Sequence, residues 1–261
     1  MSVTHTSTVA RMQTPCSYCA ARRKGLCLGI NDSDADGIAA LESARSAIRL
    51  YDPGEIIYEQ GDASEHVFNL VSGWVALHRD IADGRRQITR FLLPGAVFGA
   101  EPAGEELGHT ATAITNAIVC PIAIAKLYEL RRRIPSLNEQ FILVLEHDSQ
   151  NAIKALTSLG QGTAKERIGF LLRDLAVTAV GEDRVNAGAA VIKMPLTQRH
   201  IAQATGLTSI HVNRVLRQLR EDQVIELHDG VLSIIDPRKL RRVAEPTASW
   251  RWAAPERGWG A

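Results

Sequence analysis

The segment 197–235 restricts the fold of this chain more than any other part of the sequence. It opens with a predicted helix, makes a tight turn at Gly206, and continues as a second helix to about Glu221. Two β-rich runs then flank Asp229-Gly230, a dipeptide typical of a hairpin turn. Two helices joined by a glycine turn and followed by a hairpin are the pattern of a winged helix-turn-helix.

The second helix combines an apolar face with a face that suits a nucleic acid. Arg214 can donate two hydrogen bonds to guanine O6 and N7, and Asn213 can pair with adenine in the same way. Ile210 offers only an apolar contact, such as one to a thymine methyl group. An arginine-bearing helix exposed to solvent is the alternative, and the combined turn, wing and basic face argue against it. We predict that the protein binds double-stranded DNA and that the contacts are made by Thr197, Thr208, Ser209, Ile210, Asn213, Arg214 and Arg217.

The chain upstream of residue 134 predicts a small antiparallel β-domain. Between residues 49 and 130, short β-rich runs alternate with turn signals such as Pro53-Gly54, Asp83-Gly84 and Pro94-Gly95. A short amphipathic helix over about 35–47 precedes them. The sequence therefore predicts an α+β fold that begins with a β-roll or sandwich.

Residues 134–160 predict a long helix with a stripe of spaced side chains. The stripe advances in steps of three and four through Leu137, Phe141, Val144, Asp148, Asn151 and Ala155. It is a candidate seam between two copies of the chain, and the alternative is that it packs on the β-domain of its own chain. If Asp148 weakens such a seam, replacing it by alanine should strengthen dimerisation.

The end of the long helix is also predicted from local signals. Gly160 and Gly162 should break the helix, and Thr163 with Glu166 forms a capping box that opens another helix through about Val180. Residues 181–190 are expected to form a loop. The predicted organisation is a cysteine-rich segment at 1–30, a β-roll sensor domain at 31–133, a dimerisation helix at 134–160, a winged helix-turn-helix at 161–243 and a poorly ordered tail at 244–261.

Four cysteines suggest a site built from thiolates. Cys16, Cys19 and Cys27 lie close together, with three basic residues between Cys19 and Cys27 that favour thiolate character, whereas Cys120 lies in the β-domain. The polar N-terminus lacks a secretory signal, and no apolar run is long enough to span a membrane, so we expect a cytoplasmic protein. In a reducing compartment a four-thiolate site indicates an iron–sulfur cluster or structural zinc, with unliganded redox thiols as the further possibility.

Composition and the remaining motifs narrow the function class. Lys and Arg number 30 against 29 Asp and Glu, so any basic surface must be local. With 45% hydrophobic residues, the chain can bury a core in each of two domains. We find no phosphate-binding loop, dinucleotide fingerprint, nucleophile elbow or zincin motif, and therefore predict that the protein is not an enzyme.

The order of β-roll, long helix and winged helix-turn-helix resembles the CRP/FNR superfamily of bacterial regulators over residues 35–240. The resemblance implies a jelly roll of the cyclic-nucleotide-binding type. Cyclic-nucleotide members hold the phosphate with an Arg-Ser or Arg-Thr pair, but this chain has His109-Thr110 after Gly99-Ala100-Glu101 and lacks that arginine. FNR-type members instead carry an N-terminal cysteine cluster and one cysteine late in the roll, which the four cysteines here resemble closely.

The FNR-type resemblance implies a specific function. Cys16, Cys19, Cys27 and Cys120 would hold an oxygen- or redox-labile [4Fe-4S] cluster, and the chain would act under low oxygen as a homodimer on a palindromic promoter site with RNA polymerase as partner. The alternative is a CRP-like regulator that responds to another small effector and binds structural zinc. Seven residues separate Cys19 from Cys27, as in a related subgroup. The family's Glu-x-x-Ser-Arg pattern is replaced by Ile210 to Arg214, which predicts a half-site other than TTGAT.

Overall fold

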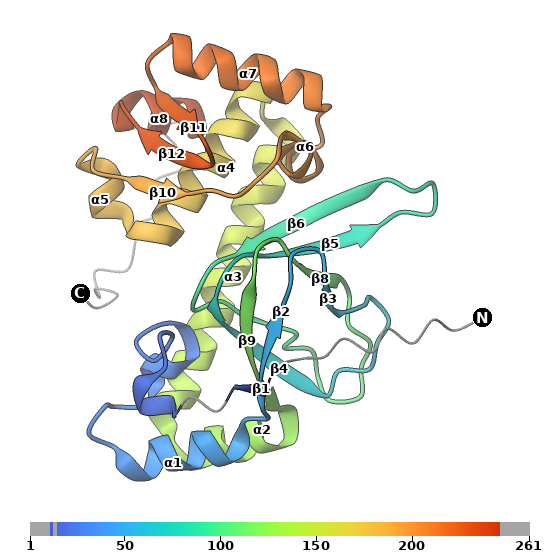
Figure 1. The fold of residues 1–261 in the computed structure, drawn as a ribbon, viewed down its shortest axis with the longest axis vertical. Coiled ribbons are helices and arrows are strands. Elements are labelled where there is room, and N and C mark those ends of the chain that lie inside the picture. The colour runs from blue at the N-terminus through green and yellow to red at the C-terminus, as the bar shows by residue number, and fades with distance from the viewer. Residues whose placement is uncertain (1–10, 13–14, 246–261) are drawn as a thin grey trace. The chain divides into compact units, whose positions relative to one another are not determined.

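The computed structural model describes residues 11–12 and 15–245, and they form two compact units. The first unit runs to Ile153 and includes Pro195–Ala204, and the second comprises Lys154–Met194 and the chain from Thr205 onward. Figure 1 shows the order of the elements along the chain. Within the described residues, no helix is both long and apolar enough to cross a bilayer.

The first unit contains a roll of antiparallel strands. The strands are β1 (Arg11–Met12), β2 (Ile48–Tyr51), β3 (Ile56–Tyr58), β4 (His66–Ser72), β5 (Val75–Asp80), β6 (Arg86–Leu92), β7 (Val97–Phe98), β8 (Thr110–Ala113) and β9 (Ala117–Ala123). One sheet has the order β1-β2-β9-β4-β7 and the other has the order β3-β8-β5-β6. Alternate side chains of the strands, including Phe68, Leu70 and Val119, form one hydrophobic core. The predicted α+β fold with an N-terminal roll is confirmed.

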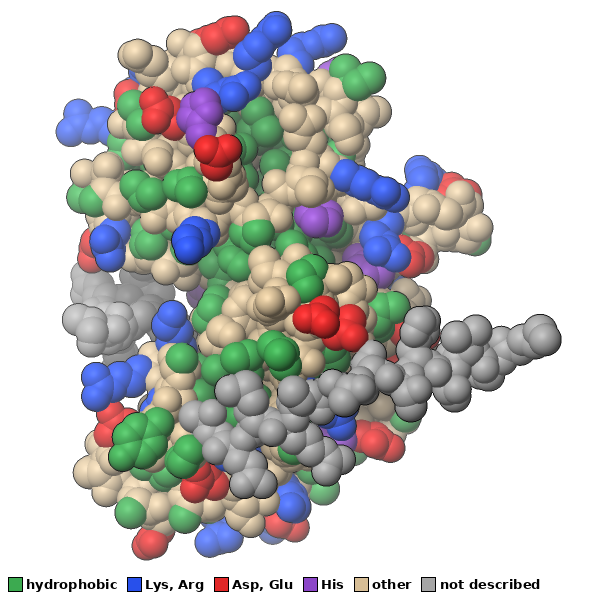
Figure 2. Space-filling model, in the orientation of Figure 1, with side chains coloured by type: hydrophobic (Ala, Val, Ile, Leu, Met, Phe, Trp, Pro, Cys, Tyr) green, Lys and Arg blue, Asp and Glu red, His purple; other side chains and the backbone are tan. Residues whose placement is uncertain are grey.

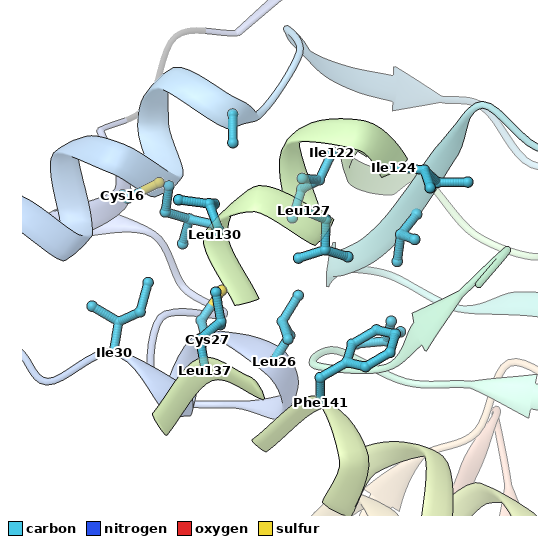
Figure 3. Close-up of a cluster of buried hydrophobic side chains, with 14 residues drawn as sticks. Cys16, Leu26, Cys27, Ile30, Ile122, Ile124, Leu127, Leu130, Leu137 and Phe141 are labelled. Atoms are coloured by element: carbon cyan, nitrogen blue, oxygen red, sulfur yellow. The ribbon is translucent and has the colours of Figure 1, made fainter. Parts of the chain in front are cut away.

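A second hydrophobic cluster lies outside the five-stranded sheet. It combines two short 3-10 helices, η1 (Cys16–Tyr18) and η2 (Gly25–Gly29), with α1 (Ala35–Ala44), α2 (Ile124–Arg133) and the start of the next helix. Figure 3 shows Leu26, Cys27 and Ile30 gathered with Leu137 and Phe141 in this cluster. The α2 helix was missed by the sequence prediction, which assigned its residues to the β-roll domain.

The long helix α3 spans Pro135–Gln161, close to the predicted range, and Gly160 lies within it rather than breaking it. The first half of the stripe packs on its own chain. Leu137 and Phe141 are buried in the second cluster of their own chain. Asp148 is also an intrachain contact, because both of its carboxylate oxygens lie 2.5 Å from the Arg90 guanidinium of β6. Asp148 therefore has a partner within its own chain, and its effect on a dimer seam stays a prediction.

Among the described residues, the second unit contains a three-stranded sheet, the end of α3 and four further helices, whereas α6 (Gln198–Thr205) lies almost entirely in the first unit. The elements of the second unit are α4 (Ala164–Val180), α5 (Glu182–Asn186), β10 (Val191–Lys193), α7 (Ser209–Glu221), β11 (Ile225–His228), β12 (Val231–Ile234) and α8 (Pro237–Ala244). The capping box is present, because Thr163 accepts from the Glu166 backbone while Glu166 accepts from the Thr163 backbone. The predicted loop at 181–190 instead contains α5. Of the predicted tail at 244–261, residues 246–261 lie outside the described residues.

Candidate functional site

All four cysteines line one pocket beside the five-stranded sheet. The pocket is small, with an accessible volume of about 20 Å³, and it is partly open to solvent. Cys16 and Cys27 are buried, whereas Cys19 and Cys120 are half-buried, and all four are free thiols. The structure thus brings together the four residues that the sequence pattern grouped, although Cys120 lies far from the others along the chain.

Strand alternation places Cys120 in the pocket. In β9, Ala117 and Val119 face the core of the roll, so Cys120 and Ile122 face the opposite side of the sheet. Directly across from Cys120 in β4 is Asn69, whose Nδ2 donates to the Cys27 sulfur at 3.4 Å. Asn69 therefore ties the N-terminal segment to the sheet. The sequence prediction missed it, because an asparagine inside an apolar strand carries no signal for its partner.

Arg22 organises the loop that carries the first three cysteines. Its guanidinium is buried and donates from Nη1 to the Cys27 carbonyl and from Nη2 to the Ile30 carbonyl, both at 2.5 Å. Nη2 also lies 3.3 Å from the Asp32 carboxylate. A buried arginine that binds backbone carbonyls fixes the loop and keeps a positive charge at the pocket wall.

The electrostatics of the pocket oppose free thiolates. Burial is the main cause that raises the pKa of Cys27 and of Cys120 to about 12, and the neighbouring cysteines add to it. Burial also raises the pKa of Cys16, while the Arg45 guanidinium opposes that rise. Thiolates gathered here need a cation among them, and a tetrathiolate metal group retains negative charge that Arg22 and Arg45 can partly balance.

The donor set fits a metal group held by four sulfurs. Sulfur is a ligand of iron–sulfur clusters and of structural zinc, and none of the described residues that line the pocket carries a carboxylate or an imidazole. Among the described residues, no three His, Cys, Asp or Glu side chains lie close enough together to hold a metal ion.

The second candidate site is the exposed face of α7. Ser209, Ile210, Asn213, Arg214 and Arg217 are all exposed. Val212, Val215, Leu216 and Leu219 are buried on the other face of the helix. Figure 2 shows Lys and Arg side chains gathered over the top of the view, where α7 lies in Figure 1. The predicted polarity of this helix, apolar inward and basic outward, is present in the structure.

The two predicted threonines have helix-capping roles. The Thr208 hydroxyl accepts from the His211 backbone N–H at 3.3 Å and caps α7. Thr197 accepts from the His200 backbone N–H at 3.2 Å, and its own N–H donates to His200 Nδ1 at 3.3 Å. Both threonines remain exposed, so each positions the start of its helix and stays accessible.

The wing has the hairpin geometry that its sequence predicts. Strands β11 and β12 pair in an antiparallel register from Ile225 opposite Ile234 to His228 opposite Val231. The two turn residues, Asp229 and Gly230, have φ values of 50° and 71°, which is the left-handed conformation that two-residue hairpin turns require.

A further polar group lies in the roll. Tyr58 Oη lies 2.7 Å from His109 Nε2, and His109 Nδ1 lies 3.7 Å from the Glu101 carboxylate. Burial lowers the pKa of His109, so its ring is neutral near pH 7. The sequence prediction assigned His109 no role, and the structure places its ring between Tyr58, which it contacts by a hydrogen bond, and Glu101.

Comparisons with known proteins agree with this architecture. The family model for the cyclic nucleotide-binding domain matches residues 48–133, and that for the Crp-like helix-turn-helix domain matches residues 166–243. The nitrogen fixation regulation protein FixK of Rhizobium meliloti is 31% identical over 74% of this chain and 85% of its own. The transcriptional activator protein FnrL of Cereibacter sphaeroides is 28% identical over 81% of this chain and 84% of its own.

A solved structure extends the similarity to the fold. That of FixK2 from Bradyrhizobium japonicum superposes with a TM-score of 0.69 at 25% identity, covering 78% of this chain and 99% of that one. The roll, the long helix and the winged helix-turn-helix therefore occur together in a known regulator. This chain belongs to the CRP/FNR family and is a DNA-binding transcription regulator, not an enzyme.

Proposed function

We propose that this regulator holds a [4Fe-4S] cluster on Cys16, Cys19, Cys27 and Cys120 and responds through it to oxygen or another oxidant. One observation carries the proposal: the fold places all four cysteines on the wall of a single pocket. When bound in such a site, the cluster supplies a redox-labile metal group that oxidation can dismantle. The similarity to the transcriptional activator proteins FnrL, FnrA and Anr supports placing this chain with the FNR-type regulators.

The cysteine loop is packed directly on the first half of α3. A Cβ added to Gly29 would lie 2.6 Å from the Leu137 Cα, so the backbones of η2 and α3 touch. Gln140 of α3 donates from Nε2 to the Gly25 carbonyl at 2.9 Å. Any change in the fold of the loop therefore changes the surroundings of α3, which gives the chain a physical route from its thiols to the helix.

The proposal extends to a homodimer that binds a palindromic promoter site in the cytoplasm and acts with RNA polymerase. Ile142, Leu145 and Leu156 are exposed on α3, at 51%, 41% and 72%. Their spacing of three and eleven residues keeps them along one side of a helix. An apolar face of this kind on the long helix fits contact with the same helix of a second copy.

The test is metal analysis of the protein purified without oxygen. We expect about four irons and four sulfides per chain, negligible zinc, and visible absorbance that bleaches when air is admitted. A Cys120→Ala variant should lose the iron and the absorbance while its metal-free form melts at the wild-type temperature to within a few degrees.

Two outcomes would contradict the proposal. One zinc per chain without sulfide would assign the pocket to a structural metal, and a metal-free chain with normal DNA binding would leave the thiols without a cofactor. Either result would leave the family assignment and the DNA-binding helix unchanged, because these rest on residues 166–243.

A further inference from the structure

Asn69 interrupts an apolar face of β4 at the wall of the pocket that the four cysteines line. Two residues earlier on the same face, Val67 is buried in the second hydrophobic cluster, opposite Ile122 of β9. Asn69 itself lies opposite Cys120 in the same register and lines the pocket. A valine or leucine at position 69 would continue the apolar face. The packing of the sheet therefore does not account for an amide at this position.

The Asn69 amide is buried without full hydrogen bonding. The side chain is 2% exposed. Its Nδ2 donates to Cys27 Sγ at 3.4 Å, while its Oδ1 is buried and has no hydrogen-bond partner among the described residues. A neutral thiol is a weak acceptor, and a buried oxygen without a donor destabilises the fold. Asn69 therefore contributes little to folding as long as Cys27 is a free thiol.

The same hydrogen bond is stronger when the sulfur is charged. A hydrogen bond to an ionised acceptor is about twice as strong as one between neutral groups. Cysteine binds a metal as its thiolate, and hydrogen bonds to the ligand sulfurs help to set the reduction potential of an iron–sulfur cluster. Because β4 is paired with β9, the ladder of the sheet fixes the position of this donor, whereas its acceptor lies on the cysteine loop. The donor is thus positioned in advance beside one ligand sulfur.

We propose that Asn69 is a positioning residue that sets the reduction potential of the cluster by donating from its amide to the Cys27 sulfur. The inference rests on the proposed [4Fe-4S] cluster. A neutral donor favours the state with more negative charge on the sulfurs, so Asn69 raises the potential at which the cluster takes up an electron. Removing the donor lowers that potential.

The experiment compares the wild-type chain with Asn69→Leu, both purified without oxygen and matched in iron and sulfide content. Leucine has a similar volume and no donor. Protein-film voltammetry measures the midpoint potential of the cluster, with the electrode as the source of the electron. In Asn69→Leu we expect the equilibrium constant for uptake of one electron to fall about threefold to tenfold, a shift of about 28–59 mV to lower potential. The metal-free variant should melt at or above the wild-type temperature, because leucine replaces a partly unsatisfied buried amide.

Val67→Ala is the matched control. Val67 lies on the same face of the same strand and is 3% exposed, but its side chain has no donor. This variant should lower the melting temperature of the metal-free chain by several degrees and leave the midpoint potential unchanged. A wild-type potential in Asn69→Leu, or an equal shift in Val67→Ala, would overturn the inference.

A further variant covers a failure of the cluster to assemble. If Asn69→Leu holds no iron, Asn69→Ala removes the same donor and leaves more space in the pocket, and its potential is measured instead. Absence of iron from both variants, with iron retained in Val67→Ala, would assign Asn69 to assembly and overturn its role in the potential. A wild-type chain without iron would overturn the proposed function as well, so the two failures are distinguishable.

Discussion

Cys27 shows how much of the site depends on single contacts. Its thiol is buried, accepts a hydrogen bond from Asn69 of β4, and its carbonyl accepts another from the buried Arg22. The thiol therefore belongs to the core of the protein as well as to the pocket. A residue with both roles should affect the free energy of unfolding of the metal-free chain.

In the reduced, metal-free chain we predict that the free energy of unfolding falls as the pH rises above about 9. Burial raises the pKa of Cys27 and Cys120 to about 12 from an ordinary 9.0, so the unfolded chain loses these protons first. The stabilising preference for the neutral thiol is complete below about pH 9 and is lost on the way to about pH 12. Each thiol contributes a slope of at most about 1.4 kcal/mol per pH unit.

Thermal melts with reductant and chelator measure this slope, with Cys27→Ala as the comparison. Above about pH 9, the melting temperature of the variant should fall less steeply with pH than that of the wild type. Near neutral pH, the two proteins should show the same pH dependence. Parallel curves for the two proteins across the whole alkaline range would show that Cys27 does not titrate as its burial requires.

At the same scale, some residues were predictable and others were not. Thr163 and Glu166 were, because a capping box is a local pattern whose partners are three residues apart. Asp148 was not, because its partner Arg90 lies in a distant strand and an acidic residue on a helical stripe suggests a flawed seam instead. Arg22 was recognised as a nearby charge, but its role in holding the loop carbonyls depends on the folded loop.

Among the elements, the contact between α4 and α8 is set by a glycine. A Cβ added to Gly169 of α4 would lie 2.6 Å from Val243 Cγ1 of α8, and valine is stiff at χ1. Gly160 of α3 meets nothing within 4 Å at the corresponding point. Close packing against α8 thus requires a glycine at position 169, whereas no packing contact requires one at position 160.

We predict opposite effects for the same change at these two sites. Gly169→Ala should lower the free energy of unfolding by about 1–3 kcal/mol through overpacking. Gly160→Ala should raise it by about 0.5–1 kcal/mol through helix propensity. Urea denaturation followed by circular dichroism compares the two, and a stabilised Gly169→Ala would mean that α8 moves away without cost.

The elements missed by sequence reasoning are those without local signals. Helix α2 follows β9 directly, with Ala123 as its N-cap and no side-chain cap, so the change from strand to helix has no punctuation. Helix α5 has only five residues, and its N-cap is Gly181, a residue expected in a loop. By contrast, α3, α4 and α7 were predictable because their periodic patterns are long and their ends are marked.

For the molecule as a whole, the proposed dimer gives the next prediction. Ile142→Glu should raise the dimer dissociation constant at least about tenfold, because each copy would bury an unpaired carboxylate in the contact. DNA affinity should fall with it. Sedimentation velocity of the protein purified without oxygen measures the association.

Ile56→Glu is the matched control. Ile56 lies in β3 and is 48% exposed, close to the 51% of Ile142, so it receives the same change at a similar surface. It should leave the association state unchanged. If both variants dissociate, the effect is one of added charge, and if neither does, the exposed face of α3 is not the contact between copies.

The order of domains was predictable at this scale, and the construction of the pocket was not. Binary patterns and turn residues are local, so the roll, the long helix and the winged helix-turn-helix follow from them. The side of the sheet on which Cys120 lies depends on the register of β9 against β4, which pairs Cys120 with Asn69. That register is a property of the folded sheet.

The position of β9 also has a consequence for how the protein is made. It is the last strand of the roll in the chain, yet it lies between β2 and β4 in the sheet. During synthesis the ribosome releases the three N-terminal thiols long before Cys120, and the sheet stays open between β2 and β4 until β9 inserts. The insertion that closes the sheet is therefore the event that delivers the fourth thiol, so a nascent chain cannot complete its pocket before its roll is folded.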